Sequence, residues 1–85
     1  MSSSLPITYT FFDLASNVRI SQELVDIPLW RALVLARLDL EWPILGREPI
    51  SLSHKGQTLT KADIRRMTEY RDGHLIRVFG QEAAA

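Results

Sequence analysis

Residues 28–40 read PLWRALVLARLDL, and at helical spacing they carry two apolar stripes where a surface helix needs only one. The first stripe consists of Leu29, Leu33, Ala36 and Leu40, with Ala32 beside it. The second consists of Trp30, Val34 and Leu38, each four residues apart. Because a small domain is expected to bury only one stripe, the surplus stripe predicts a surface that binds a partner.

Prolines mark both ends of this predicted helix. Pro28 is suited to the first turn of a helix, and Pro43 disfavours helical geometry at Trp42. Upstream, residues 7–14 (ITYTFFDL) are rich in β-branched and aromatic side chains, and residues 18–24 restart a two-residue period. Turn-forming residues lie between these two runs. The sequence therefore predicts an N-terminal β-hairpin followed by the helix.

Downstream of the helix, residues 50–54 alternate in polarity and predict a third strand, followed by a turn at residues 55–57. Thr60 and Asp63 resemble a capping box that opens a short helix over residues 62–70. The dipeptide Asp72-Gly73 predicts a turn, and residues 74–80 (HLIRVFG) predict a final apolar strand. We expect this strand to pair in parallel with the first, since both are apolar enough to lie centrally.

The expected fold class is α+β, with one long helix across a mixed sheet of four to five strands and a short second helix. A length of 85 residues, 46% of them hydrophobic, suits one domain at residues 6–80, between a flexible leader (1–5) and a disordered tail (81–85). Without a signal-peptide pattern or an apolar run of roughly 20 residues, we expect cytoplasmic localisation and no membrane insertion.

No constellation of residues indicates catalysis. The chain has no cysteine, and Ser53 and His54 are adjacent in a strand, so their side chains lie on opposite faces and cannot form a nucleophile–base pair. His54, His74 and Asp72 lack the spacing of a metal site. The four glycines are scattered, which disfavours a phosphate-binding loop. We therefore expect no enzymatic activity, no cofactor, no metal and no small-molecule substrate.

Four arginines in the C-terminal half form a candidate patch for an anionic partner: Arg65, Arg66, Arg71 and Arg77. The alternative is a solvated helix face, since Glu69 and Asp72 are interleaved with them. Ten basic and ten acidic residues cancel over the whole chain, which favours the alternative and predicts no nucleic-acid partner.

The order of elements and the stretch GQTLTKADIRRMTEYRDGHLIRVF, residues 56–79, resemble the ubiquitin-like β-grasp proteins over residues 7–79. In both, a glycine and a leucine (here Gly56 and Leu59) precede a short helical turn, and a tyrosine (Tyr70) precedes the closing strand. The chain looks most like the small bacterial YukD/EsaB type, in which an Asp-Gly turn introduces the final strand. That resemblance implies an accessory role at a type VII secretion system, exerted through protein contacts.

The C-terminus departs from the conjugated members of that superfamily, which end in Gly-Gly. Here Gly80 is followed by residues 81–85, QEAAA, and the chain contains no Gly-Gly pair. Activity as a ubiquitin-like modifier or a sulfur carrier would therefore require trimming of the tail.

The leading prediction is a non-catalytic protein–protein interaction module. Its expected interface is Trp30, Val34, Leu38 and Trp42, because aromatic anchors are typical of interfaces. The partner is expected to be a second copy of the chain, giving a homodimer, or a larger complex. Two alternatives stay open: a modifier or sulfur carrier activated at its C-terminus, and an accessory subunit of a multicomponent enzyme.

Overall fold

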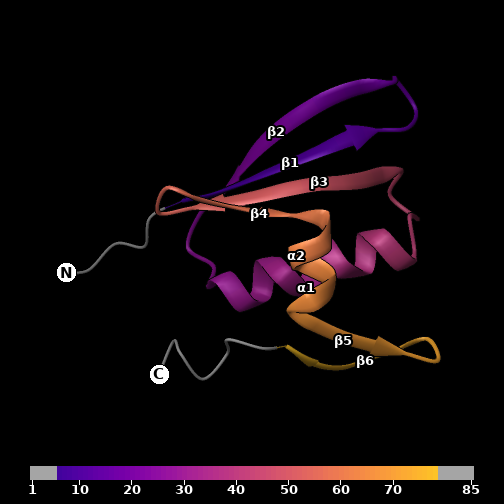
Figure 1. Cartoon of the computed structure of the whole chain (residues 1–85). Helices are drawn as coiled ribbons and strands as arrows, with labels where there is room; N and C mark the ends of the chain where they lie inside the picture. Colours follow the sequence, from indigo (N-terminus) through magenta and orange to yellow (C-terminus); the bar gives the residue numbers. More distant parts are fainter. Residues whose placement is uncertain (1–5, 79–85) are drawn as a thin grey trace.

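The predicted central helix is α1, Leu29–Glu41, and in space it lies between two β layers (Figure 1). The computed structural model of the chain describes residues 6–78. Pro28 stands at the N-cap of α1 in an extended conformation, and the helix ends within one residue of the expected position. The two prolines thus set the boundaries of the helix as predicted.

The larger layer is a four-stranded sheet in the order β2-β1-β3-β4. Its strands are β1 (Ile7–Asp13), β2 (Val18–Leu24), β3 (Arg47–His54) and β4 (Gln57–Thr60). β1 and β2 form the predicted N-terminal hairpin, from the pair Ile7↔Leu24 to the pair Asp13↔Val18. The alternation of β1 turns Ile7, Tyr9 and Phe11 toward α1, where all three are buried.

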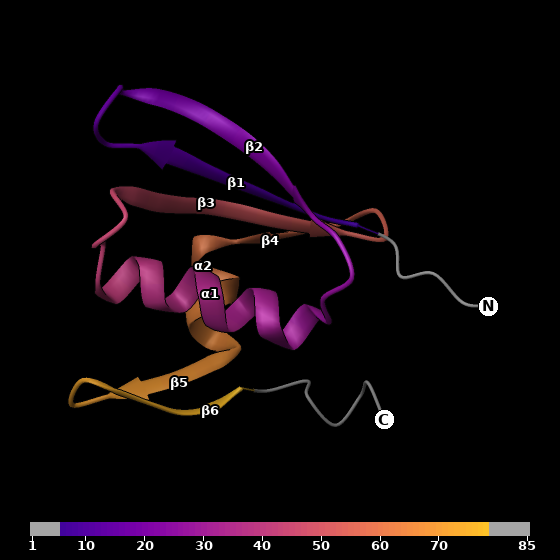
Figure 2. The ribbon, with the colours of Figure 1, turned by 180° about the vertical axis from the view of Figure 1, so that it is seen from behind.

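The smaller layer is an antiparallel hairpin of β5 (Thr68–Arg71) and β6 (His74–Val78), which lies on the side of α1 opposite the sheet. The view from behind shows the same three layers, with α2 (Lys61–Arg66) leading from β4 down past α1 to β5 (Figure 2). The fold class is therefore α+β, as predicted.

The expected parallel pairing between the first and last strands is wrong. Both edges of β1 are occupied by antiparallel neighbours, β2 on one side and β3 on the other, and β6 pairs with β5 instead. The physical reason is the length of β3, which begins at Arg47 rather than at Ile50 and is long enough to follow β1 from Thr8 to Asp13. All pairings among the described residues are antiparallel, so the expected mixed sheet is not formed.

Two short strands, β4 and β5, were not predicted. The helix expected over residues 62–70 ends at Arg66, and Tyr70 lies on β5. Each short strand belongs to a hairpin with a two-residue loop, Lys55-Gly56 or Asp72-Gly73. In both loops the two residues have positive φ, at 53° and 78° in the first and 55° and 82° in the second. Glycine tolerates this conformation, which suits the twist of a tight hairpin.

The core lies between the sheet and α1 and is completed by α2 and β6. Its fully or nearly buried side chains are Ile7, Tyr9, Phe11, Ala32, Leu33, Ala36, Leu52, Ile64 and Val78. The small residues Ala32 and Ala36 line the part of α1 that faces the sheet, where a larger side chain would hold the two layers apart. Burial of a side chain such as Leu33 stabilises the fold by about 1.5–3 kcal/mol.

The predicted leader and tail, and the last two residues of the predicted final strand, lie outside the described residues. Within residues 6–78, no helix combines the length and the apolar character needed to cross a bilayer.

Candidate protein-binding surface

The second apolar stripe of α1 is divided between the interior and the surface. Trp30 and Val34 are half-buried and pack against the core. They share a helical face with Arg37, which reaches β5, so this face lies toward the hairpin. Leu38 is 39% exposed, and Trp42, just beyond the helix, is 53% exposed. The structure therefore leaves only these two members of the predicted interface on the surface.

Leu38 and Trp42 belong to a larger exposed apolar surface at the end of α1, which we call the end patch. It consists of Leu35, Leu38, Trp42, Ile44 and Leu45. The first three are spaced by three and four residues and so lie on one side of the helix axis. Ile44 and Leu45, in the loop that follows, are 82% and 65% exposed. Such a concentration of large apolar side chains in one short segment is typical of a binding surface.

Backbone hydrogen bonds hold the loop of the end patch in a defined shape. The Trp42 N–H donates to the Leu38 carbonyl at 2.7 Å, and the Gly46 N–H donates to the Pro43 carbonyl at 3.1 Å. The Leu14 N–H donates to the Gly46 carbonyl at 2.8 Å, which ties the loop to the end of β1. Gly46 has a φ of +71°, which a side chain would strain. Ile44 and Leu45 are therefore presented by a structured turn.

The Trp42 ring is oriented by its own polar atom. Its Nε1–H donates a hydrogen bond to the Tyr70 hydroxyl on β5. This bond satisfies the indole N–H and leaves more than half of the residue open to solvent. Trp42 belongs to the interface predicted from the sequence, whereas Leu35, Ile44 and Leu45 do not. The available signal for the last two was a pair of adjacent large aliphatic residues in a short loop.

A buried polar cluster joins α1 to the sheet. The Tyr9 hydroxyl donates to Asp39 Oδ2 at 2.7 Å, and Arg47 Nε lies 3.4 Å from the same oxygen. The Arg47 guanidinium also lies over the Phe11 ring, 5.5 Å from its centroid. Asp39 is only 6% exposed, so its carboxylate depends on these two partners for compensation.

This cluster changes the acidity of Tyr9. Burial, above all, raises the pKa of the Tyr9 phenol well above its ordinary value of 10.0, and the hydrogen bond to Asp39 raises it further, while the charge of Arg47 lowers it. The phenol therefore stays protonated and acts as a hydrogen-bond donor. Because Asp39 on α1 contacts both Tyr9 on β1 and Arg47 on β3, the cluster fixes the rotation of α1 against the sheet.

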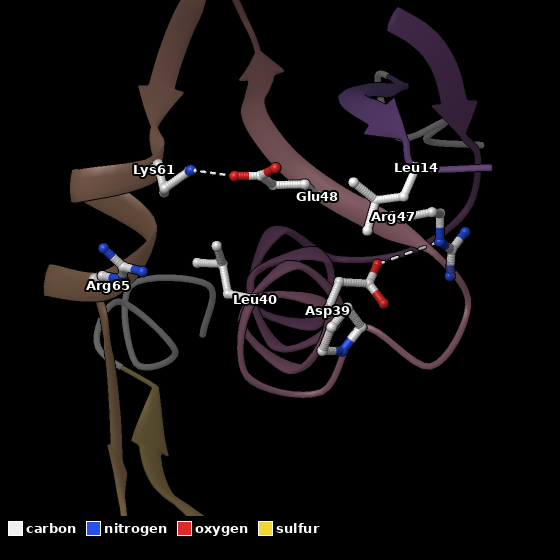
Figure 3. Close-up of a pocket in the computed structure, with 8 residues that line it drawn as sticks. Leu14, Asp39, Leu40, Arg47, Glu48, Lys61 and Arg65 are labelled. Atoms are coloured by element: carbon white, nitrogen blue, oxygen red, sulfur yellow. Dashed lines mark hydrogen bonds and ion pairs between the residues drawn. The ribbon is translucent and has the colours of Figure 1, made fainter. Parts of the chain in front are cut away.

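Beside this cluster is an open pocket of about 200 Å³ between the end of α1, the start of β3 and α2 (Figure 3). Both of its carboxylates are already paired, Glu48 with Lys61 at 2.9 Å and Asp39 with Arg47. The other lining residues are Leu14, Leu40, Pro43 and Arg65. The charged groups of the lining therefore lie mostly in ion pairs with one another.

The four arginines of the predicted anionic patch lie on α2, β5 and β6. Three of them have an acidic partner: Arg66 pairs with Asp63 at 2.8 Å, while Arg71 and Arg77 both approach Glu69, at 3.3 Å and 3.5 Å. Arg65 lines the pocket. Much of the positive charge is therefore compensated locally, which supports the alternative of a solvated face.

The two histidines lie in different layers, His54 at the end of β3 and His74 at the start of β6. Among residues 6–78, no group of three or more His, Asp or Glu side chains is arranged to hold a metal ion.

Comparison of the chain with protein-family models, with curated proteins and with solved structures gave no match.

Proposed function

We propose that this chain is a non-catalytic protein-interaction module and that the end patch is its docking surface. The observation that carries the proposal is the exposure of five large apolar side chains in an ordered segment of eleven residues, from Leu35 to Leu45. Docking of a partner protein would remove these apolar side chains from water. Each side chain that becomes fully buried would contribute about 1.5–3 kcal/mol to the free energy of binding.

The end patch also has the composition of an interface. Trp42 offers a large, oriented aromatic anchor, and the aliphatic residues around it offer adaptable contact area. Arg31 and Glu41 are exposed on α1 and provide charged groups at the margin. An apolar centre with a polar rim is the common arrangement of protein–protein interfaces.

The finer assignment is also a proposal. We place the chain among the ubiquitin-like β-grasp proteins of the YukD/EsaB type, with an accessory, cytoplasmic role at a bacterial type VII-like secretion system. The order of an N-terminal hairpin, a helix and later strands supports this placement. The antiparallel pairing of β1 with β3 departs from it, because a central parallel pair is expected in that superfamily.

The test is the double variant Ile44→Ser, Leu45→Ser. Both side chains are mostly exposed, so the free energy of unfolding should change little, while association with the cellular partner should weaken about tenfold or more. The measurement is quantitative mass spectrometry of chemically cross-linked complexes from source cells, comparing wild type and variant.

The control is Val25→Ser with Ile76→Ser, which removes two large apolar side chains that are 58% and 50% exposed on other parts of the surface. The control should keep the wild-type complexes. Equal retention of complexes by both double variants would contradict the end patch as the docking surface.

A further inference from the structure

The outer edge of β2 is open among the described residues. β2 is an edge strand of the four-stranded sheet, and its one neighbour, β1, pairs with all seven of its residues. About half of its backbone N–H and C=O groups point away from β1 and have no strand to bond with. The opposite edge of the sheet, β4, is only four residues long.

Three of the usual devices that protect an edge strand, namely lysine, proline and a bulge, are missing from β2, whose charged side chains are Arg19 and Glu23. Its sequence, VRISQEL, contains neither lysine nor proline, and its pairing with β1 runs without a bulge. Val18 and Ile20 are 51% and 37% exposed, so apolar side chains flank the open edge. An edge of this kind favours the addition of another strand.

The charges of β2 identify the added strand as another copy of β2. Arg19 and Glu23 have opposite signs and lie two residues on either side of Ser21. In an antiparallel pair of two identical strands centred on Ser21, Arg19 of each copy faces Glu23 of the other. Cross-strand pairs of opposite charge stabilise a sheet, and neither residue makes an ion pair with another described residue of its own chain.

We propose that two copies of this chain associate through β2, antiparallel and across a two-fold axis at Ser21, to form a continuous eight-stranded sheet. The Ser21 side chain stands perpendicular to the sheet, against Thr10, and so leaves the two backbones free to approach to hydrogen-bonding distance. Each contact occurs twice, as in any interface between identical surfaces. This inference uses a surface separate from the end patch and does not depend on it.

The register follows from the length and pattern of the strand. Centring on Ser21 is the only alignment in which all seven residues have a partner. Val18 then faces Leu24 and Ile20 faces Gln22, on the side of the sheet that carries α1. A slip by two residues removes the Arg19–Glu23 pairs, and a slip by one residue would set side chains of opposite faces against each other.

Single-cysteine variants test this register directly, because the chain has no cysteine of its own. Opposed residues of an antiparallel pair have Cα atoms about 4.5–5.5 Å apart, which a disulfide can span. Ser21→Cys should therefore form a covalent dimer under mild oxidation. Arg19→Cys and Glu23→Cys should each form no covalent dimer alone and cross-link only when the two variants are mixed.

Charge reversal supplies an independent test by sedimentation equilibrium. Arg19→Glu or Glu23→Arg alone places like charges opposite each other at two sites, and we expect each to raise the dimer dissociation constant about tenfold. The double variant with both changes restores opposite charges and should return to the wild-type value. Lys55→Glu, in the loop between β3 and β4, is the matched control and should leave the constant unchanged.

Three outcomes would overturn the proposal. The first is a wild-type chain that is monomeric up to millimolar concentration. The second is a Ser21→Cys variant that cross-links no better than cysteine variants at the adjacent positions of β2, and the third is a double charge reversal that fails to restore the dimer. A dimer dissociated by Ile44→Ser with Leu45→Ser, but not by either charge reversal, would assign self-association to the end patch instead.

Discussion

Asp39 is a charged residue in the interior of the fold, only 6% exposed. The other buried residues of α1 are apolar, and the Asp39 carboxylate is compensated by one phenol from β1 and one guanidinium from β3. Buried charges without such partners are strongly unfavourable. These contacts therefore favour one rotation of α1 over the sheet, because turning the helix would separate the Asp39 carboxylate from Tyr9 and Arg47.

The variant Asp39→Asn removes this charge while keeping the shape of the side chain. The Arg47 guanidinium would lose its carboxylate, so we expect the free energy of unfolding to fall by about 2 kcal/mol in urea denaturation. Glu41→Gln, at the more exposed end of the same helix, removes an i,i+4 pair with Arg37 and should cost less than about 0.5 kcal/mol. Similar losses in both variants would contradict a special role for Asp39.

The sequence allowed some of these residues to be placed and not others. The alternation of residues 7–14 correctly predicts that Ile7, Tyr9 and Phe11 share one face. It does not reveal that Tyr9 bonds to a residue thirty positions later, because no local pattern reports a contact between distant elements. Asp39 reads in the sequence as an ordinary polar residue near a helix end.

At the scale of the element, α2 shows how a six-residue helix is held in place. The Asp63 N–H donates to Thr60 Oγ1 and the Thr60 N–H donates to Asp63 Oδ2, which completes the predicted capping box. Arg66 donates a further hydrogen bond to the Asp63 carboxylate at 2.8 Å. Together, the bond from Arg66 and then those from Thr60 lower the pKa of Asp63 below its ordinary value of 3.8.

The lowered pKa fixes the direction of a pH effect. Above the ordinary value the ionised Asp63 stabilises the folded state, and this contribution is lost as the pH falls through the lower folded-state pKa. Arg66→Ala should raise the pKa of Asp63 toward 3.8, measured by carbon-detected NMR titration. Arg71→Ala, which removes an arginine with a different partner, should leave it unchanged. A pKa of Asp63 insensitive to Arg66 would show that Thr60 alone sets it.

The elements differ in how well the sequence predicts them. α1 and the first hairpin have long periodic patterns and proline or turn boundaries, so their positions are predicted closely. β4 and β5 have four residues each and little apolar alternation, and their existence depends on the hairpin loops. The Lys55-Gly56 loop in particular places a lysine at positive φ, which composition alone does not indicate.

At the scale of the whole molecule, Arg37 connects α1 to the hairpin. Its guanidinium donates to the Arg65 and Thr68 carbonyls and to Thr68 Oγ1, and it lies over the Tyr70 ring at 5.3 Å. The sheet is held to α1 by apolar packing and by the Tyr9–Asp39–Arg47 cluster. Each of the two layers around the helix therefore has its own polar attachment to α1.

Arg37→Met keeps an apolar stem but removes these polar contacts. We expect amide hydrogen exchange in β5 and β6 to become about tenfold faster, with little change in β1 and β3, as in an opening confined to one layer. Arg31→Met, on the exposed side of the same helix, should have no such effect. Equal acceleration in both layers would show that the molecule opens as one unit.

The layered arrangement is also what the sequence analysis could not provide. The stripe pattern on α1 predicts that one stripe is left for a partner, but two members of that stripe, Trp30 and Val34, are half-buried within the same chain. The pattern could not predict that a hairpin of the same chain lies against the other side, because β5 was assigned to a helix. Trp30 and Val34 are half-buried for that reason, and the exposed apolar residues shift to the end of the helix.

The position of α1 between two layers has a consequence for biosynthesis. Residues of α1 emerge from the ribosome before residues 68–78. Until β5 and β6 emerge, the sheet is the most that α1 can pack against. During that interval Trp30 and Val34 face water without the hairpin, and the growing polypeptide is most prone to capture by chaperones or to aggregation. This period ends when β5 and β6 have left the ribosome and packed against α1.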